Sequence, residues 1–263
     1  TPASKGINLD TYGQCAPCRQ ESPVVMDERP KIAITGSSGF IGGELVKRFR
    51  NEGTPVLAMQ RTLPAAASQG ECIRFALNQP FEETKLDGVR CLVHCAVQVY
   101  SPRWPDSDRV NVEGTRKLLE VCRTRKIRFV FLSTLSAHAG AESHYGRHKL
   151  QLEGIVLREG GLVLKLGLVL GQAGVFYTIR KLIELSKVIP LIGGGNQPIQ
   201  TIAMDDLLLA LEKCIREKVT GLYHLAEPRA IPIRELYRCT AERCHRHPVF
   251  VTVPLAPMLI LVK

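Results

Sequence analysis

The chain has 263 residues, of which 45% are hydrophobic and 23% are charged, and its formal net charge is +10 at pH 7. This composition is typical of a globular protein with one large domain, or with one domain and a small appendage. No apolar run reaches the ~18 residues that a membrane-spanning helix needs. Basic residues gather between 116 and 128, but no aromatic and basic module typical of nucleic-acid binding accompanies them.

The first part of the chain and its cysteines carry little patterning. Residues 1–30 contain four prolines among polar residues, so we expect an N-terminal extension outside the fold, with a composition compatible with disorder. The nine cysteines are scattered, which favours reduced thiols and a cytoplasmic location. The segment "CAPC" (Cys15 and Cys18) and the later Cys239 and Cys244 lack a second CxxC partner, and we predict no metal site.

From residue 31 onward, short apolar strands alternate with helical patterns. The strand "KIAIT" is followed by a glycine turn and the amphipathic helix "GGELVKRFRNEG". Further strands are predicted at "PVLAMQR", "CLVHCAV", "FVFLST" and "GLVLKLGLVL", with helices at "VEGTRKLLEVCRTR" and "YGRHKLQLEGIVLREG". Continuous apolar strands separated by helices indicate an α/β fold with a doubly wound parallel sheet. We place this domain at residues 31–170 and a smaller, less regular substrate-side portion at residues 171–263.

The turn "TGSSGFIGG" predicts a dinucleotide site. Between a strand and a helix, Gly36 permits a tight turn, Gly39 lets the backbone approach a pyrophosphate, and Gly42 lets the helix pack on the strand. The free N–H groups and the dipole at the helix start would then hold the phosphates. The residues expected to contact the dinucleotide are Gly36, Ser38, Gly39, Phe40, Ile41, Gly42, Arg61, Ala96, Tyr145 and Lys149.

The end of the second predicted strand, "AMQRT", bears on which dinucleotide binds. An NAD site usually has an Asp or Glu there to accept a hydrogen bond from the ribose 2′-hydroxyl. This chain has no acid at that point and has Arg61 instead, whose guanidinium would bind a 2′-phosphate. NADP is therefore favoured, and NAD remains the alternative if Arg61 points to solvent.

The segment "YGRHK" predicts a catalytic pair. Tyr145 and Lys149 are four residues apart and share one face of a helix, and the strand "FVFLST" ends upstream in Ser133 and Thr134. A phenol with a pKa near ~10 is a poor acid or base at neutral pH. A neighbouring ammonium and an oxidised nicotinamide would lower that pKa. The strand-end hydroxyl would hold the substrate oxygen while hydride moves between the substrate carbon and the nicotinamide.

In combination, these segments resemble extended short-chain dehydrogenases/reductases of the NAD-dependent epimerase/dehydratase family. The resemblance spans roughly residues 31–250, in the family's order, through "TGSSGFIGGEL", "LVHCAV", "NVEGT", "FLSTLSAH", "YGRHK", "KLGLVLGQ" and "AMDDLLLAL". It implies a Rossmann domain that binds NAD(P), a C-terminal portion that binds the substrate, most often a nucleotide-sugar, and a homodimer. The family's catalytic triad maps onto Thr134, Tyr145 and Lys149, with Ser133 as the alternative hydroxyl.

Three departures from the family pattern bear on function. Many nucleotide-sugar members place an arginine for the diphosphate just before "AMDDL", where this chain has Ile199, although Arg180 and Lys181 could compensate. Residues 134–136 lack the acid typical of dehydratases, which favours reduction or epimerisation. The chain stops at "PMLILVK", earlier than full-length members, which indicates truncation or packing on a partner. A non-catalytic NADP(H)-binding scaffold or assembly subunit is therefore the alternative to an enzyme.

Several polar residues admit a bland interpretation beside a functional one. Asn111 in "NVEGT" is either near the active site or the cap of a helix. His94 is predicted to be a core histidine bonded to backbone. His138, His144 and His148 are predicted at the surface, with His144 a candidate for tuning substrate access.

Overall fold

The computed structural model describes residues 30–63, 71–98 and 104–254. The predicted N-terminal extension up to residue 29, with Cys15 and Cys18, and the tail "PMLILVK" therefore lie outside the described residues. Within the described ranges, no helix is both long enough and apolar enough to cross a membrane.

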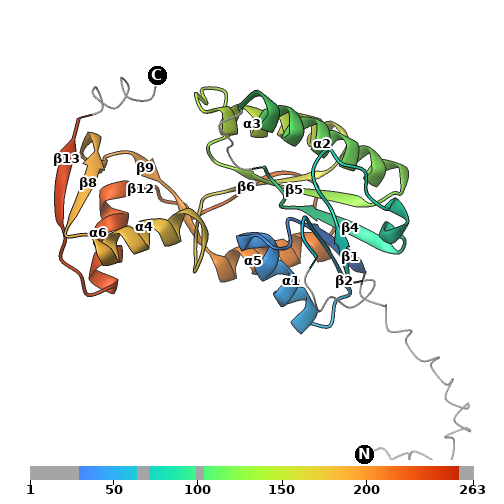
Figure 1. Ribbon diagram of the computed structural model, residues 1–263, viewed down its shortest axis with the longest axis horizontal. Coiled ribbons are helices and arrows are strands. Elements are labelled where there is room, and N and C mark those ends of the chain that lie inside the picture. The colour runs from blue at the N-terminus through green and yellow to red at the C-terminus, as the bar shows by residue number, and fades with distance from the viewer. Residues whose placement is uncertain (1–29, 64–70, 99–103, 255–263) are drawn as a thin grey trace, which may run out of the picture.

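A seven-stranded sheet forms the centre of the molecule, in the order β11-β6-β5-β4-β1-β2-β3 (Figure 1). Every neighbouring pair in it is parallel. Its strands are β1 (Lys31–Thr35), β2 (Val56–Gln60), β3 (Cys72–Arg74), β4 (Val89–His94), β5 (Arg128–Thr134), β6 (Leu162–Leu166) and β11 (Gly221–Leu225). The inner strands are runs of buried apolar residues because both faces of a parallel sheet are covered. This is the predicted doubly wound Rossmann fold.

Two pairs of helices cover the two faces of this sheet. On one face, α1 (Phe40–Asn51) and α5 (Met204–Arg216) share a hydrophobic core with the strands. On the other, α2 (Trp104–Thr124) and α3 (His144–Arg158) build a second core. Because the strands are parallel, their carboxyl ends and the loops that follow lie along one edge, where such folds bind ligands.

A smaller C-terminal part stands beside the sheet (Figure 1). Its helices are α4 (Gly174–Leu185) and α6 (Ile233–Arg243), and a small core forms around Ile183, Ile189 and Ala241. Three two-stranded ladders join β7 (Leu168–Leu170) to β10 (Thr201–Ala203), β9 (Pro198–Ile199) to β12 (Ile231–Pro232), and β8 (Val188–Ile192) to β13 (Val249–Val253). Two 3₁₀ turns, η1 (Glu83–Leu86) and η2 (Gly193–Gly195), complete the described elements.

The chain passes between the two parts more than once. After residue 171, α5 packs in the same core as α1, and β11 pairs with β6 at the edge of the large sheet. The domain boundary at residue 170 remains a prediction from the sequence. In the structure, segments that follow this residue return to the large sheet. Residues of β9 and of the start of α4 line the same cavity as the carboxyl ends of β5 and β6.

Candidate active site

The glycine turn has the geometry of a phosphate cradle. Gly36 has a φ of +65°, and a Cβ there would lie 2.9 Å from the backbone of Ala96. A Cβ on Gly42 would overlap the carbonyl of Gly36. Helix α1 begins after Gly39, where no side chain caps its N-terminus. A larger residue would fill this cradle, and the uncapped N–H groups suit an anionic ligand.

A cavity of about 430 Å³ opens over this turn. All ten residues predicted to contact a dinucleotide line it, including Arg61 from the end of β2, Ala96 after β4, and Tyr145 and Lys149 from α3. Residues 75–77, which follow β3, and Gln98 also line it and were not predicted from the sequence. A site that joins a phosphate cradle to the carboxyl ends of the neighbouring strands fits an extended dinucleotide.

A chain of hydrogen bonds among buried threonine and histidine side chains lies behind Ala96, which lines this cavity. His94 Nδ1 lies 2.7 Å from Thr35 Oγ1, and His94 Nε2 lies 3.0 Å from Thr115 Oγ1. Thr35 Oγ1 also accepts a hydrogen bond of 3.1 Å from the backbone N–H of Ala96. Burial lowers the pKa of His94 to about 3, so the ring is neutral and structural. The prediction of a core histidine is confirmed, but its partners are hydroxyls rather than backbone.

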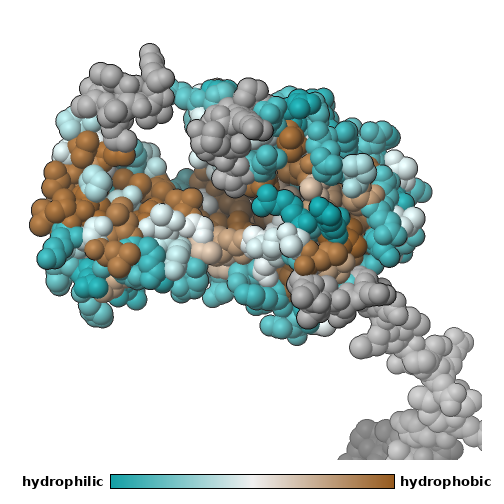
Figure 2. All heavy atoms as spheres, in the orientation of Figure 1, coloured by the Kyte–Doolittle hydropathy of each residue, from teal (hydrophilic) through white to brown (hydrophobic). Residues whose placement is uncertain are grey.

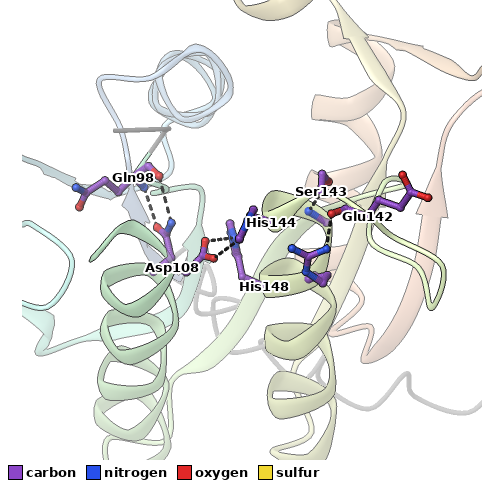
Figure 3. A network of polar contacts seen from close by, with 9 residues as sticks. Gln98, Asp108, Glu142, Ser143, His144 and His148 are labelled. Carbon is purple, nitrogen blue, oxygen red and sulfur yellow. Dashed lines mark hydrogen bonds and ion pairs between the residues drawn. The ribbon is translucent and has the colours of Figure 1, made fainter. Parts of the chain in front are cut away.

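Asn111 binds the backbone of the loop that follows β4 through two hydrogen bonds. It lies inside α2 rather than at its start, so the helix-cap interpretation is wrong. Its side chain is buried, accepts from the backbone N–H of Gln98 at 2.8 Å and donates to the carbonyl of Gln98 at 3.1 Å (Figure 3). Because Gln98 lines the cavity, Asn111 fixes one of its walls.

Tyr145 and Lys149 meet the cavity from the first two turns of α3. Lys149 is buried, and its Nζ donates to the carbonyl of Leu132 at 2.7 Å. The same Nζ lies 4.4 Å from the ring centroid of Phe131 and 6.0 Å from that of Tyr145. Tyr145 is 42% exposed because it borders this cavity and a second one. The predicted pair therefore shares one face and one cavity.

Burial governs the electrostatics of this pair in the protein alone. Burial lowers the pKa of Lys149 to about 8, against smaller opposing effects of Cys95 and Glu153. Burial raises the pKa of the Tyr145 phenol in the protein alone, whereas the lower pKa was predicted for the ammonium together with an oxidised nicotinamide. The protein alone thus disfavours the phenolate, and a positively charged ligand would be needed to favour it.

The two candidate hydroxyls at the end of β5 have different partners. Ser133 is buried and donates to Glu153, which also binds the Lys165 ammonium 3.2 Å away. Thr134 Oγ1 accepts from the backbone N–H of Ser136 at 3.2 Å. The hydroxyl proton of Ser133 is therefore already donated to Glu153. Thr134 only accepts in its bond with Ser136, so its hydroxyl proton can still be donated to a ligand. Both residues line the second cavity.

Gly146 allows the strand-end loop to approach Tyr145. A Cβ on Gly146 would lie 2.5 Å from the carbonyl oxygen of Ser136. We expect Gly146→Ala to lower the free energy of unfolding by about 1–3 kcal/mol, since the loop must move. Gly154→Ala, in the same helix with only the Arg158 side chain 3.5 Å away, should raise it by about 0.5–1 kcal/mol. Urea unfolding of both variants measures this, and equal shifts would contradict the close approach.

An aspartate joins α2 to the start of α3. Asp108 accepts from Nδ1 of His144 and from Nδ1 of His148, each at 3.2 Å (Figure 3). His144 and His138 are exposed, as predicted. His148 is buried, so its surface prediction is wrong, and burial is the main cause that lowers its pKa. The network holds the helix that carries Tyr145 against its neighbour.

The described residues contain no group of three or more His, Cys, Asp or Glu side chains able to hold a metal ion. Cys15 and Cys18 lie outside them. Cys239 and Cys244 are free cysteines on or after α6.

Comparison with known proteins matches the part of the chain that contains these residues. The family model described as "NAD dependent epimerase/dehydratase family" matches residues 32–226. The chain belongs to this family. Membership confirms the resemblance, the Rossmann fold and the enzyme class that the sequence analysis predicted. The matched range includes residues of every strand of the large sheet and most of the segments that border the two cavities.

Members of this family with known names show the range of relatives. CDP-abequose synthase of Salmonella muenchen is 26% identical over 246 residues, which cover 84% of this chain and 83% of that protein. Ceramide reductase of Caulobacter vibrioides is 26% identical over 220 residues, which cover 77% of this chain and 66% of that protein. The structure of MoeE5 in complex with UDP-glucuronic acid and NAD matches with a TM-score of 0.72 at 25% identity, over 85% of each chain.

Proposed function

We propose that this protein is an NAD(P)-dependent reductase or epimerase that transfers hydride at a hydroxyl-bearing or keto carbon. The observation that carries the proposal is that Tyr145 borders both the cavity over the glycine turn and the second cavity beside it. A side chain at this junction can contact a substrate while its neighbour Lys149 lines the dinucleotide cavity. A nicotinamide bound there would supply or accept the hydride.

Three side chains would handle the proton and the substrate oxygen. Tyr145 donates its phenolic proton to the oxygen of a carbonyl substrate, or removes the proton of a hydroxyl substrate. Lys149 stabilises the resulting phenolate through its charge. Thr134 donates a hydrogen bond to the same substrate oxygen. Ser133 positions the strand end through its bond with Glu153.

The cofactor would be NADP rather than NAD. Arg61 is exposed at the cavity edge, and Gln60 beside it already accepts a hydrogen bond of 3.1 Å from Ser37. No carboxylate lines this cavity among the described residues. A guanidinium without a competing acid suits a 2′-phosphate.

We expect Arg61→Ala to weaken NADPH binding about 10-fold or more, because a charge-assisted hydrogen bond contributes about 1.5–3 kcal/mol. NADH affinity should hardly change. Arg90→Ala is the control, since Arg90 is exposed at the start of β4, and that end of the strand faces away from the cavity. Fluorescence titration of both nucleotides measures the ratio of affinities, and an unchanged ratio in Arg61→Ala would contradict the NADP assignment.

The substrate class, assembly and location also remain proposals. The named relatives act on nucleotide-linked sugars and, in one case, on a ceramide, and hydride transfer needs only a hydroxyl or keto carbon in either. A nucleotide-sugar substrate, a homodimer and a cytoplasmic location are what the sequence favoured.

The proposed function is tested by mixing the protein with NADPH and a panel of keto sugars linked to nucleotides and of simple ketones. A reductase consumes NADPH in proportion to product, whereas an epimerase regenerates its cofactor and needs only a trace. Absence of any turnover across the panel, with the cofactor bound, would contradict the proposal.

A further inference from the structure

A second cavity, of about 810 Å³, opens beside the dinucleotide cavity. Phe40, Ser133 and Tyr145 border both. It is lined by the end of β5, the loop after β6, the start of α4 and β9. Figure 2 shows the surface hollowed between the two parts of the molecule. The volume of the second cavity is in the range of small-molecule sites. Under the proposed function, this cavity receives the substrate.

Polar side chains, Tyr145 among them, and a larger number of apolar side chains line the cavity. The polar ones come from the end of β5, the loop after it and the start of α3, joined by Gln200, whose amide already donates to the carbonyl of Glu227 at 2.7 Å. The apolar wall comes mostly from other segments and includes Leu168, Val175, Pro198, Ile199 and Ala230, and Leu135 adds to the apolar lining from the loop after β5. Val175 is 66% exposed and offers apolar surface to a ligand in this cavity.

The described lining of this cavity contains no arginine, lysine, aspartate or glutamate. The two basic residues of α4 that could have compensated bind Glu184 instead, with Arg180 Nε at 3.3 Å and Lys181 Nζ at 2.8 Å. The bond from Lys181 is the main cause that lowers the pKa of Glu184. His138 is the one imidazole in the described lining, and it is not a fixed cation of the kind that an arginine or lysine supplies. A diphosphate placed against these walls would lose hydration without gaining such a cation, which is costly.

The start of α4 also adjoins the cavity, and a helix N-terminus attracts anions through a partial charge of about +0.5. An aromatic ring occupies this position. A Cβ on Gly174 would lie 2.9 Å from Cδ1 of Phe40, and one on Gly171 would lie 2.6 Å from its Cζ. The phenyl ring is therefore packed against the helix start and adds apolar surface where a phosphate would have to bind.

We propose that the substrate is a neutral aliphatic ketone or secondary alcohol, whose carbonyl or hydroxyl lies at Tyr145 and whose alkyl chain covers the apolar wall around Ile199. This rests on the proposed function and names its substrate class. In the reductive direction, the carbonyl carbon gains a hydride from NADPH, its oxygen gains the phenolic proton of Tyr145, and the products are a secondary alcohol and NADP⁺. Solvent then returns a proton to the phenol.

The first test measures binding without turnover. Hexan-2-ol, octan-2-ol, decan-2-ol and UDP are titrated calorimetrically into the protein, in the absence and presence of NADP⁺. Each added methylene should raise the affinity about 3- to 4-fold until the wall is covered, and UDP should bind more weakly than decan-2-ol. An affinity that does not change with chain length, or tighter binding of UDP, would overturn the proposal.

A matched pair of variants locates the alkyl chain. Ile199→Arg places a cation on the apolar wall and should weaken decan-2-ol binding about 10-fold or more, while strengthening UDP binding. Ile192→Arg makes the same change on the exposed face of β8 and should alter neither affinity. Equal effects of both variants would overturn the placement at Ile199.

Turnover of the matching ketones separates this proposal from the proposed function. Reduction of ketones that depends on Tyr145 but not on chain length would overturn the substrate class and leave hydride transfer standing. Chain-length-dependent binding with no Tyr145-dependent turnover would overturn hydride transfer and support the ligand class.

Discussion

Replacement of Tyr145 by phenylalanine should lower kcat/KM for ketone reduction about 10²–10⁴-fold, the range that general acid–base catalysis contributes. The change removes one oxygen atom from a side chain that borders both cavities. The ring that packs edge-on against His148, with centroids 5.4 Å apart, remains, so the helix should keep its position. NADPH affinity should therefore be unchanged, and the loss should appear in kcat.

Tyr223→Phe is the control for this variant. Tyr223 lies on β11, is 47% exposed and borders neither cavity, so the same loss of a hydroxyl should leave kcat/KM unchanged. Stopped-flow single-turnover kinetics separate chemistry from binding. A Tyr145→Phe enzyme with the kcat of the wild type would contradict the assigned proton donor.

Replacement of Lys149 by methionine should lower kcat about 10²-fold or more, because the phenolate would lose the charge that stabilises it. The wild type should also lose kcat/KM as the pH rises through about 8, the value to which burial lowers the pKa of Lys149, since the ammonium then deprotonates. Lys213→Met, on an exposed part of α5, should leave both the rate and the pH profile unchanged.

Stability should respond to this lysine in the opposite sense. A buried ammonium with a folded-state pKa below its ordinary value of 10.5 costs folding free energy, fully so below pH ~8 and progressively less toward pH ~10.5. Lys149→Met should therefore be at least as stable as the wild type at neutral pH, with any advantage declining at high pH. Urea midpoints across pH measure this, and a large loss of stability at neutral pH would show that Lys149 has a mainly structural role.

The local motifs were predictable because residues only a few positions apart determine their geometry. The glycine turn and the Tyr145–Lys149 pair each lie on one strand–helix junction or one helix face, and all ten expected residues line one cavity. The roles of Asn111 and His148 depend on where α2 lies against α3 and the loop after β4, which no local spacing reveals. For that reason His148 was predicted at the surface, and Asn111 was left open between a position near the active site and a helix cap.

Some segments of the site could not be predicted from the sequence, and the physical reasons differ from one segment to the next. Strand β3 has only three residues, too few for a periodic signal, so the cavity residues that follow it went unnoticed. The apolar wall around Ile199 forms only because the chain crosses back to the sheet after α4. The engagement of Ser133 by Glu153 joins residues twenty positions apart, and it is the reason we propose Thr134 rather than Ser133 as the hydroxyl that binds the substrate oxygen.

Transfer of deuterium tests the central claim most directly. The protein is mixed with decan-2-one and NADPH that carries deuterium at the transferable position of the nicotinamide, and the alcohol is analysed by mass spectrometry. We predict one deuterium on the carbinol carbon, with label transfer nearly abolished in Tyr145→Phe at equal NADPH occupancy. Bound NADPH that passes no label to any ketone or keto sugar, with or without the phenol, would contradict the assignment of hydride transfer to this site.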